Sequence, residues 1–244
     1  MSSDWKCELA RASFFYSGPV AAIEPDELWK LVEAKEPERD ESLRAENIRT
    51  LSLTLADGAQ LLTLNLQPGR IDWMLTTSMG KYVDVAPKVI PEFSQRVAGG
   101  MAKSAREFSR LALGLVLQMP VENRKSGYDT LLQLVPSLRV EYSEDLSDLM
   151  LQLNRRHNSS VSNSLRINRH MKWSVMRFTT LGFLASGSGG IVTHADSDQH
   201  TCRLELDINT APEPPTLFKG DLVVNIFNEF MSDALETMSK GERI

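Results

Sequence analysis

Four potential metal ligands occupy alternate positions in the segment HADSDQH, namely His194, Asp196, Asp198 and His200. In an extended strand such residues point to one side, and imidazoles with carboxylates can hold zinc or another divalent transition metal. Consecutive ligands on one strand stand about 6.5 Å apart, which is too far for all four to reach one ion without a bend. A polar hairpin loop is the simpler interpretation, so we predict neither a metal nor a cofactor.

A glycine-rich segment, ASGSGG at positions 185–190, is the second candidate. Its glycines could let backbone N–H groups approach a phosphate. A Walker-type loop, however, needs GxxxxGK[ST] at the start of a helix, whereas here no lysine follows and Ile191, Val192 and Thr193 favour a strand. The sequence therefore predicts a connection between two strands.

The third candidate is a basic segment from Leu149 to Ala195 that contains no acidic residue, although the whole chain has a net charge of −5. Alternation along a strand predicts a polar, basic face opposite an apolar one. Such a face could bind phosphate, nucleic acid or an acidic protein, with Trp173 stacking on a base if exposed. Alternatively, its charges pair with the acidic remainder of the chain. The predicted partner-binding residues are Arg155, Arg156, Arg166, Arg169, His170, Lys172 and Arg177.

No catalytic motif occurs in the chain, and we predict no catalytic residue. GxSxG, HExxH and a GxGxxG after a strand are all missing. Carboxylate pairs such as Glu205 with Asp207 have no context that separates them from surface charge. Because triads assemble from distant positions, the missing motifs lower the odds of an enzyme without excluding one.

Composition indicates an ordinary globular protein. The 244 residues are 42% hydrophobic and 24% charged, which is enough to bury a substantial core. Cys7 and Cys202 are not in CxxC or metal-ligand spacing, which favours a reducing compartment. The sequence shows neither a signal peptide nor a long apolar run, so we expect a cytoplasmic protein with no membrane partner.

The clearest structural pattern lies at positions 47–77, where three runs of alternating apolar residues are separated by Asp57-Gly58 and Pro68-Gly69. This pattern predicts a three-stranded antiparallel meander. Residues 33–47 are predicted to form a charged helix end and loop. Further strands are predicted at 6–16, 109–119, 139–142, 149–155, 165–178 and 201–208. Helices are predicted from Pro25, at 90–108, at 128–134 with Ser126 as its cap, and at 221–239. The Gly99-Gly100 pair predicts a kink or close packing in the second helix.

These elements predict an α+β fold in which antiparallel β-meanders pack on long amphipathic helices. A meander followed by a helix occurs twice, at 47–108 and at 149–239. We therefore expect two similar sheet-and-helix lobes, residues 1–142 and 143–244, which could also form one continuous domain.

Several segments, in chain order and across most of the sequence, resemble a sporadically distributed family of uncharacterised bacterial proteins of about this length. They are the meander with Trp73, SRLALGLVLQMPV at 109–121, YDTLLQLVPSL at 128–138, LELDINT at 204–210 and the terminal EFMSDALETM. In that family the middle segment carries an arginine-glycine-leucine-arginine-tyrosine pattern, where this chain has Arg110 but departs at Ala112 and Leu113. The resemblance implies the fold, a bacterial origin and an accessory or defence role, and supplies no catalytic residues.

The sequence thus favours a non-enzymatic binding protein that exposes a basic sheet face to an anionic partner, either a protein or a nucleic acid. A homo-oligomer is a further expectation. The alternative is a small-molecule-binding protein with an apolar pocket between sheet and helix, lined by Trp73, Phe93, Trp173 and Phe227.

Overall fold

The structure is a computed structural model that describes residues 5–17, 24–43, 47–55, 58–77, 85–141, 143, 146, 149–185, 191–213 and 215–242. For residues 179–185 and 191–198 it describes the backbone but not the side chains.

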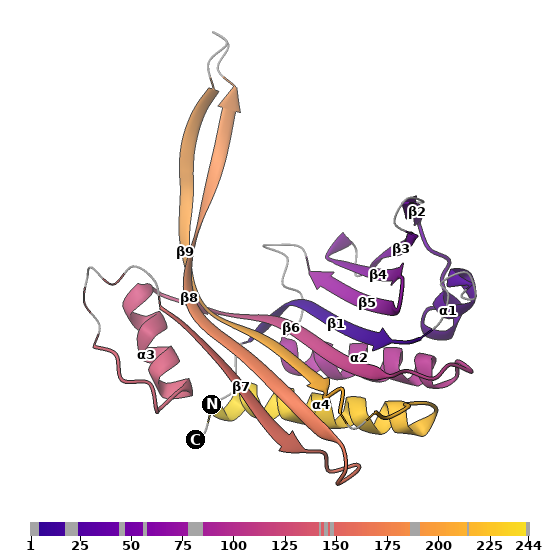
Figure 1. Cartoon of the computed structure of the whole chain (residues 1–244). Coiled ribbons are helices and arrows are strands. Elements are labelled where there is room, and N and C mark those ends of the chain that lie inside the picture. Colours follow the sequence, from indigo (N-terminus) through magenta and orange to yellow (C-terminus); the bar gives the residue numbers. More distant parts are fainter. Residues whose placement is uncertain are drawn as a thin grey trace.

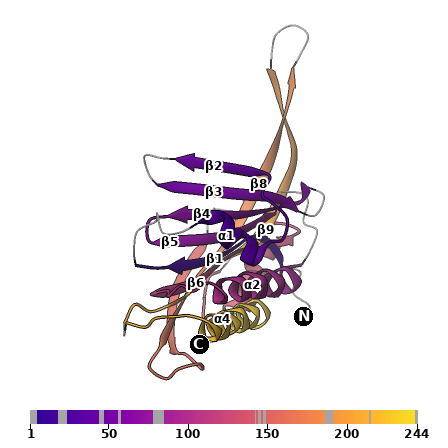
Figure 2. The same ribbon diagram turned by 90° about the vertical axis from the view of Figure 1, so that its right-hand side faces the viewer.

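The described strands form one antiparallel sheet of nine strands in the order β2-β3-β4-β5-β1-β6-β9-β8-β7 (Figures 1 and 2). β1 and β6 lie side by side near its centre. The strands from the first half of the chain extend the sheet on one side of this pair, and those from the second half on the other. The strands are β1 (Lys6–Phe15), β2 (Arg39–Leu43), β3 (Ile48–Leu55), β4 (Gln60–Gln67), β5 (Arg70–Thr77), β6 (Arg110–Val121), β7 (Met150–Asn158), β8 (Arg166–Ala185) and β9 (Ile191–Thr210).

The described helices pack on one face of this sheet. They are α1 (Pro25–Val32), α2 (Ala86–Ala102), α3 (Arg124–Leu134) and α4 (Asp221–Lys240). Figure 1 shows α2 and α4 side by side beneath the central strands. No described helix covers the opposite face, which we call the open face.

Alternation along the strands directs the large apolar side chains toward the helices. Phe14 of β1 stacks on Phe227 of α4, with ring centroids 5.1 Å apart. Trp29 of α1 lies against Trp73 of β5, with centroids 5.5 Å apart. Because these side chains are buried, the core lies between the sheet and the helices, and the open face carries mainly polar residues.

The structure confirms the α+β class and the three-strand meander, which is β3, β4 and β5. It corrects the prediction for residues 33–47, where β2 forms the sheet edge. The sequence RDESL hides this strand because all five residues are exposed. Both halves of the chain join one sheet, so two separate lobes are not seen.

Helix boundaries differ from the prediction in the second helix. α2 ends at Ala102, so Phe108 lies outside the helix, where it pairs with Phe218 and is fully buried. The Gly99-Gly100 pair marks close packing, because a Cβ on Gly100 would lie 2.6 Å from the side chain of Val32. The cap of α3 is Asn123, with Ser126 completing a capping box. Residues 139–141 form no strand.

β8 and β9 are longer than predicted and extend beyond the rest of the sheet. β8 pairs with β7 only through Ser174, and β9 pairs with β6 only from His200 onward. Residues 178–185 and 191–199 therefore pair only with each other, and we call them the arm. At the rise of an extended strand, residues 178–185 span about 26 Å. Figure 1 shows this arm projecting beyond the other strands of the sheet.

Candidate functional site

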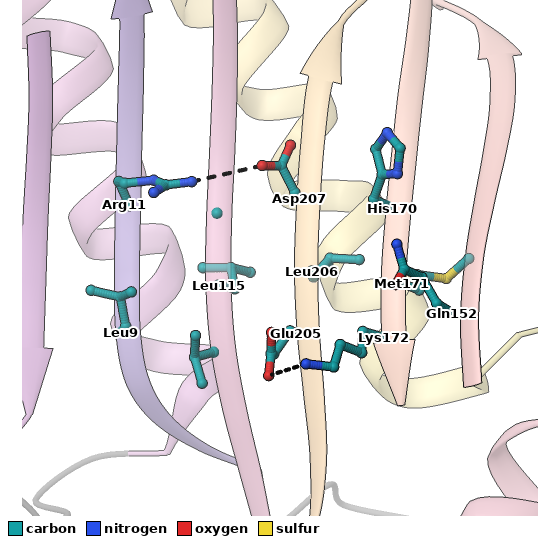
Figure 3. A pocket seen from close by; sticks show the side chains of 12 residues that line it. Leu9, Arg11, Leu115, Gln152, His170, Met171, Lys172, Glu205, Leu206 and Asp207 are labelled. Atoms are coloured by element: carbon teal, nitrogen blue, oxygen red, sulfur yellow. Dashed lines mark hydrogen bonds and ion pairs between the residues drawn. The ribbon is translucent and has the colours of Figure 1, made fainter. Parts of the chain in front are cut away.

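Two rows of open-face residues cross five neighbouring strands of the sheet, from β7 to β1. The first row runs across β7, β8, β9, β6 and β1 as Asn154, His170, Asp207, Gly114 and Arg11. The second contains Gln152, Lys172, Glu205, Val116 and Leu9. These rows, apart from Asn154, line a cavity of about 330 Å³ (Figure 3).

Gly114 makes room for the guanidinium of Arg11 on the floor of this cavity. The two residues are paired between β1 and β6. A Cβ on Gly114 would lie only 3.2 Å from Nη2 of Arg11 and 3.4 Å from its Nε. A glycine within a strand often marks a place where another group approaches the backbone closely, and here that group is the guanidinium.

Asp207 faces Arg11 across the cavity but does not bond to it closely. Nη2 of Arg11 lies 3.7 Å from Oδ2 of Asp207, beyond hydrogen-bonding distance. Oδ1 of Asp207 instead accepts a 2.6 Å hydrogen bond from Nδ2 of Asn209. Asn209 is buried, and its Oδ1 accepts hydrogen bonds from Arg110 and Asn168. The Asp207 carboxylate is thus held by the amide of Asn209, which Arg110 and Asn168 in turn fix in place.

A second charged chain closes the other end of the cavity. Nζ of Lys172 lies 3.3 Å from Oε1 of Glu205, which also accepts a hydrogen bond from Arg203. Arg203 then donates to Glu8, which also accepts a hydrogen bond from Gln118. Glu205 is therefore shared between Lys172 and Arg203.

Beyond the Lys172–Glu205 pair lies a second cavity of about 270 Å³ at the base of the arm. It shares Lys172, Glu205 and Arg203 with the charged chain just described. Two exposed methionines, Met150 and Met176, also line it, at 62% and 37% exposure. The two cavities therefore lie next to each other on the open face and share the Lys172–Glu205 pair.

Basic residues outnumber acidic ones on the open face of β1, β6, β7, β8 and β9, among the residues that the structure describes. The basic residues there include Arg11, Arg110, Arg156, Arg166, Lys172 and Arg203, and the acidic ones are Glu8, Glu205 and Asp207. This contrasts with the net charge of −5 for the whole chain.

The structure divides the predicted basic residues between the two faces. Arg166, His170 and Lys172 lie on the open face with Arg156. Arg155 and Arg169 lie on the helix side, where both form ion pairs with Glu242, which is 1% exposed. Arg177 lies at the base of the arm, paired with His200. The basic segment therefore contributes partly to the open face and partly to an internal ion-pair cluster.

The predicted metal ligands lie on β9, and the side chains of His194, Asp196 and Asp198 lie outside the described residues. The pairing of β8 with β9 skips Asp196, because Thr180 pairs with Ser197 and Leu181 with Ala195. The alternation of the four predicted ligands along β9 is therefore interrupted at Asp196. Where the structure describes side chains, no three His, Cys, Asp or Glu residues gather as metal ligands. Of the glycine-rich segment, residues 186–190 also lie outside the described part.

The four aromatic residues of the expected apolar pocket lie in the packed core. Trp73 and Trp173 are fully buried, and Trp173 packs against Trp5 with ring centroids 6.1 Å apart. Phe227 packs between Phe14 and Phe230. Phe93 lines a separate cavity of about 110 Å³ near α2. Their positions do not support a common ligand pocket.

The two thiols are not activated for chemistry. Burial raises the pKa of both Cys7 and Cys202 to about 12, so both are protonated at neutral pH. Within the described residues, no helix has the length and hydropathy needed to cross a membrane.

Sequence reasoning missed Arg11 and Gly114, which form the centre of the site. One signal was present, because a single arginine interrupts the first strand and a single glycine interrupts the apolar run of β6. Their pairing depends on the β1–β6 register, which the sequence alone does not supply. Comparison with known proteins found no matching family model, no similar curated protein and no similar solved structure.

Proposed function

We propose that this chain is a non-enzymatic binding protein whose open face holds an acidic segment of a protein partner. The observation that carries the proposal is the excess of basic residues on the open face of a chain whose net charge is −5. Opposite charge raises the rate of encounter and fixes the register of a bound partner. The uncovered face of an antiparallel sheet also leaves these side chains accessible.

Two observations favour a protein over a nucleic acid. Binding of single strands relies on aromatic side chains that stack on bases. Trp173 is fully buried, and where the structure describes side chains the large exposed apolar residues are aliphatic or methionine. The sequence of the arm is also uncharged from Phe178 to Thr193, and such a segment offers no cation to phosphates. A two-stranded ribbon without further strands gains stability from additional contacts, which a protein partner can provide.

The test compares two triple variants with equal loss of charge. One neutralises the open face as Arg156→Gln, Arg166→Gln and Lys172→Gln, and leaves Arg169 in place because it pairs with Glu242. The control neutralises three exposed lysines away from this face as Lys30→Gln, Lys103→Gln and Lys219→Gln. Fluorescence anisotropy measures binding of a labelled glutamate-rich peptide and of a labelled single-stranded oligonucleotide of equal formal charge.

We expect the peptide to bind more tightly than the oligonucleotide. The open-face variant should lose about tenfold in affinity, since three exposed charge contacts together contribute on the order of 1.4 kcal/mol. The control variant should bind like the unmodified protein. Tighter binding of the oligonucleotide, or equal affinities of the two variants for the peptide, would contradict the proposal.

A further inference from the structure

We infer that the cavity around Arg11 is a specific oxyanion site, in which the guanidinium of Arg11 receives a carboxylate or phosphate group of the bound ligand. This inference rests on the proposed function and deepens it. It names the point on the open face where one anionic group is recognised by geometry as well as by charge.

The guanidinium of Arg11 has N–H donors that make no hydrogen bond within the described part of the chain. A guanidinium has five N–H donors in a fixed planar fork. Nε of Arg11 is buried and has no hydrogen-bond partner within the described part of the chain. Its ionic partner, Asp207, lies 3.7 Å from Nη2 and takes its short hydrogen bond from Asn209 instead. The fork is therefore oriented by a charge without being saturated by hydrogen bonds.

The guanidinium of Arg11 is also accessible to a ligand. The Arg11 side chain is 34% exposed and lies at the edge of the 330 Å³ cavity. Figure 3 shows Arg11 reaching from β1 toward Asp207 and Lys172 reaching from β8 toward Glu205, from opposite sides of the cavity. Because Gly114 has no side chain, the guanidinium can lie against the strand and leave the space above it open.

The charged lining of the cavity consists of Arg11 and Lys172 together with Glu205 and Asp207. Both carboxylates already accept a hydrogen bond from a neighbour outside this set, Glu205 from Arg203 and Asp207 from Asn209, which leaves donors of Arg11 for an added anion. A planar fork matches the two oxygens of a carboxylate or phosphate, which gives shorter and stronger hydrogen bonds than a neutral acceptor does. Carboxylate and phosphate share this chemistry, so the probe must distinguish the two.

The experiment observes Arg11 directly by NMR. In protein labelled with ¹⁵N-arginine, the Nε–Hε signal of Arg11 is assigned by its loss in the Arg11→Lys variant. The protein is titrated separately with N-acetylglutamate and with inorganic phosphate, each against sodium chloride at matched ionic strength. We expect a saturable downfield shift of the Arg11 signal with at least one oxyanion and none with chloride, and the tighter oxyanion identifies the source.

Two variants sharpen the result. Gly114→Ala adds a Cβ 3.2 Å from the guanidinium and should weaken oxyanion binding about tenfold while the fold is retained, because the contacted atom is the end of a flexible side chain. Arg11→Lys keeps the charge but loses the fork, and should weaken binding of the glutamate-rich peptide about tenfold. An Arg11 signal that does not saturate with either oxyanion, or that saturates equally in Gly114→Ala, would overturn the inference.

Peptide binding by Arg11→Lys and by the open-face triple variant separates the oxyanion site from the proposed function. If Arg11→Lys binds the peptide normally while the open-face triple variant does not, the acidic segment binds along the face without an anchor at Arg11. If neither variant affects peptide binding, the proposed function fails together with the anchor.

Discussion

At the scale of single residues, the open face is organised by side chains that act through their neighbours. Asn209 is 2% exposed and links Asp207, Arg110 and Asn168 by hydrogen bonds. Buried polar networks of this kind fix side-chain positions when every member has a partner. The sequence predicts the strand parity of such residues but not these contacts, because Asn209 lies 41 positions from Asn168 and 99 from Arg110.

His157 provides a test of the helix side of β7. Its Nε2 lies 3.1 Å from Asp233 of α4, and this hydrogen bond raises the pKa of His157 above its ordinary value of 6.5. Because the folded-state pKa is raised, the protonated form stabilises the fold. This stabilisation should be complete below about pH 6.5 and disappear as pH rises through the folded-state pKa.

The measurement is the midpoint of thermal unfolding against pH for the unmodified protein and for His157→Gln. The unmodified protein should be the more stable of the two at acidic pH, with the difference shrinking toward alkaline pH. A difference that grows with pH would contradict this assignment of His157 and Asp233.

At the scale of elements, the sequence predicts those helices and strands in which buried apolar residues recur at regular spacing. The meander of β3, β4 and β5 was predicted because one face of each strand is apolar. β2 was not predicted, because an edge strand with every residue exposed has no such pattern. The length of β8 and β9 was also missed, because the arm has no third strand and so no alternation set by a core.

The contact between α1 and α2 can be tested with adjacent glycines. A Cβ at Gly100 would lie 2.6 Å from Cγ2 of Val32 and 2.7 Å from the carbonyl oxygen of Leu31, whereas a Cβ at Gly99 meets no atom within 4 Å. Gly100→Ala should therefore destabilise the protein by about 2 kcal/mol through overpacking. Gly99→Ala should stabilise it by up to about 1 kcal/mol through helix propensity. Urea denaturation measures both changes, and equal effects of the two substitutions would show that the helices do not meet at Gly100.

At the scale of the whole molecule, one sheet separates two environments. All the described helices and the aromatic core lie on one side, and the polar rows with their two cavities lie on the other. The sequence predicts this division within β8, where Arg166, His170 and Lys172 alternate with apolar residues. It does not predict that Arg11 from the first strand completes the site, because Arg11 reaches Asp207 only through the β1–β6 and β6–β9 pairings, whose registers the sequence does not supply.

The most direct test of the open-face proposal is a map of backbone amide chemical shifts on binding of the glutamate-rich peptide. We expect the largest shifts in β1, β6, β7, β8 and β9, around Arg11, Gly114, His170 and Lys172, and we expect them to diminish as salt is added. Shifts concentrated in α2 and α4 on the other side of the sheet, or no saturable shifts, would contradict it.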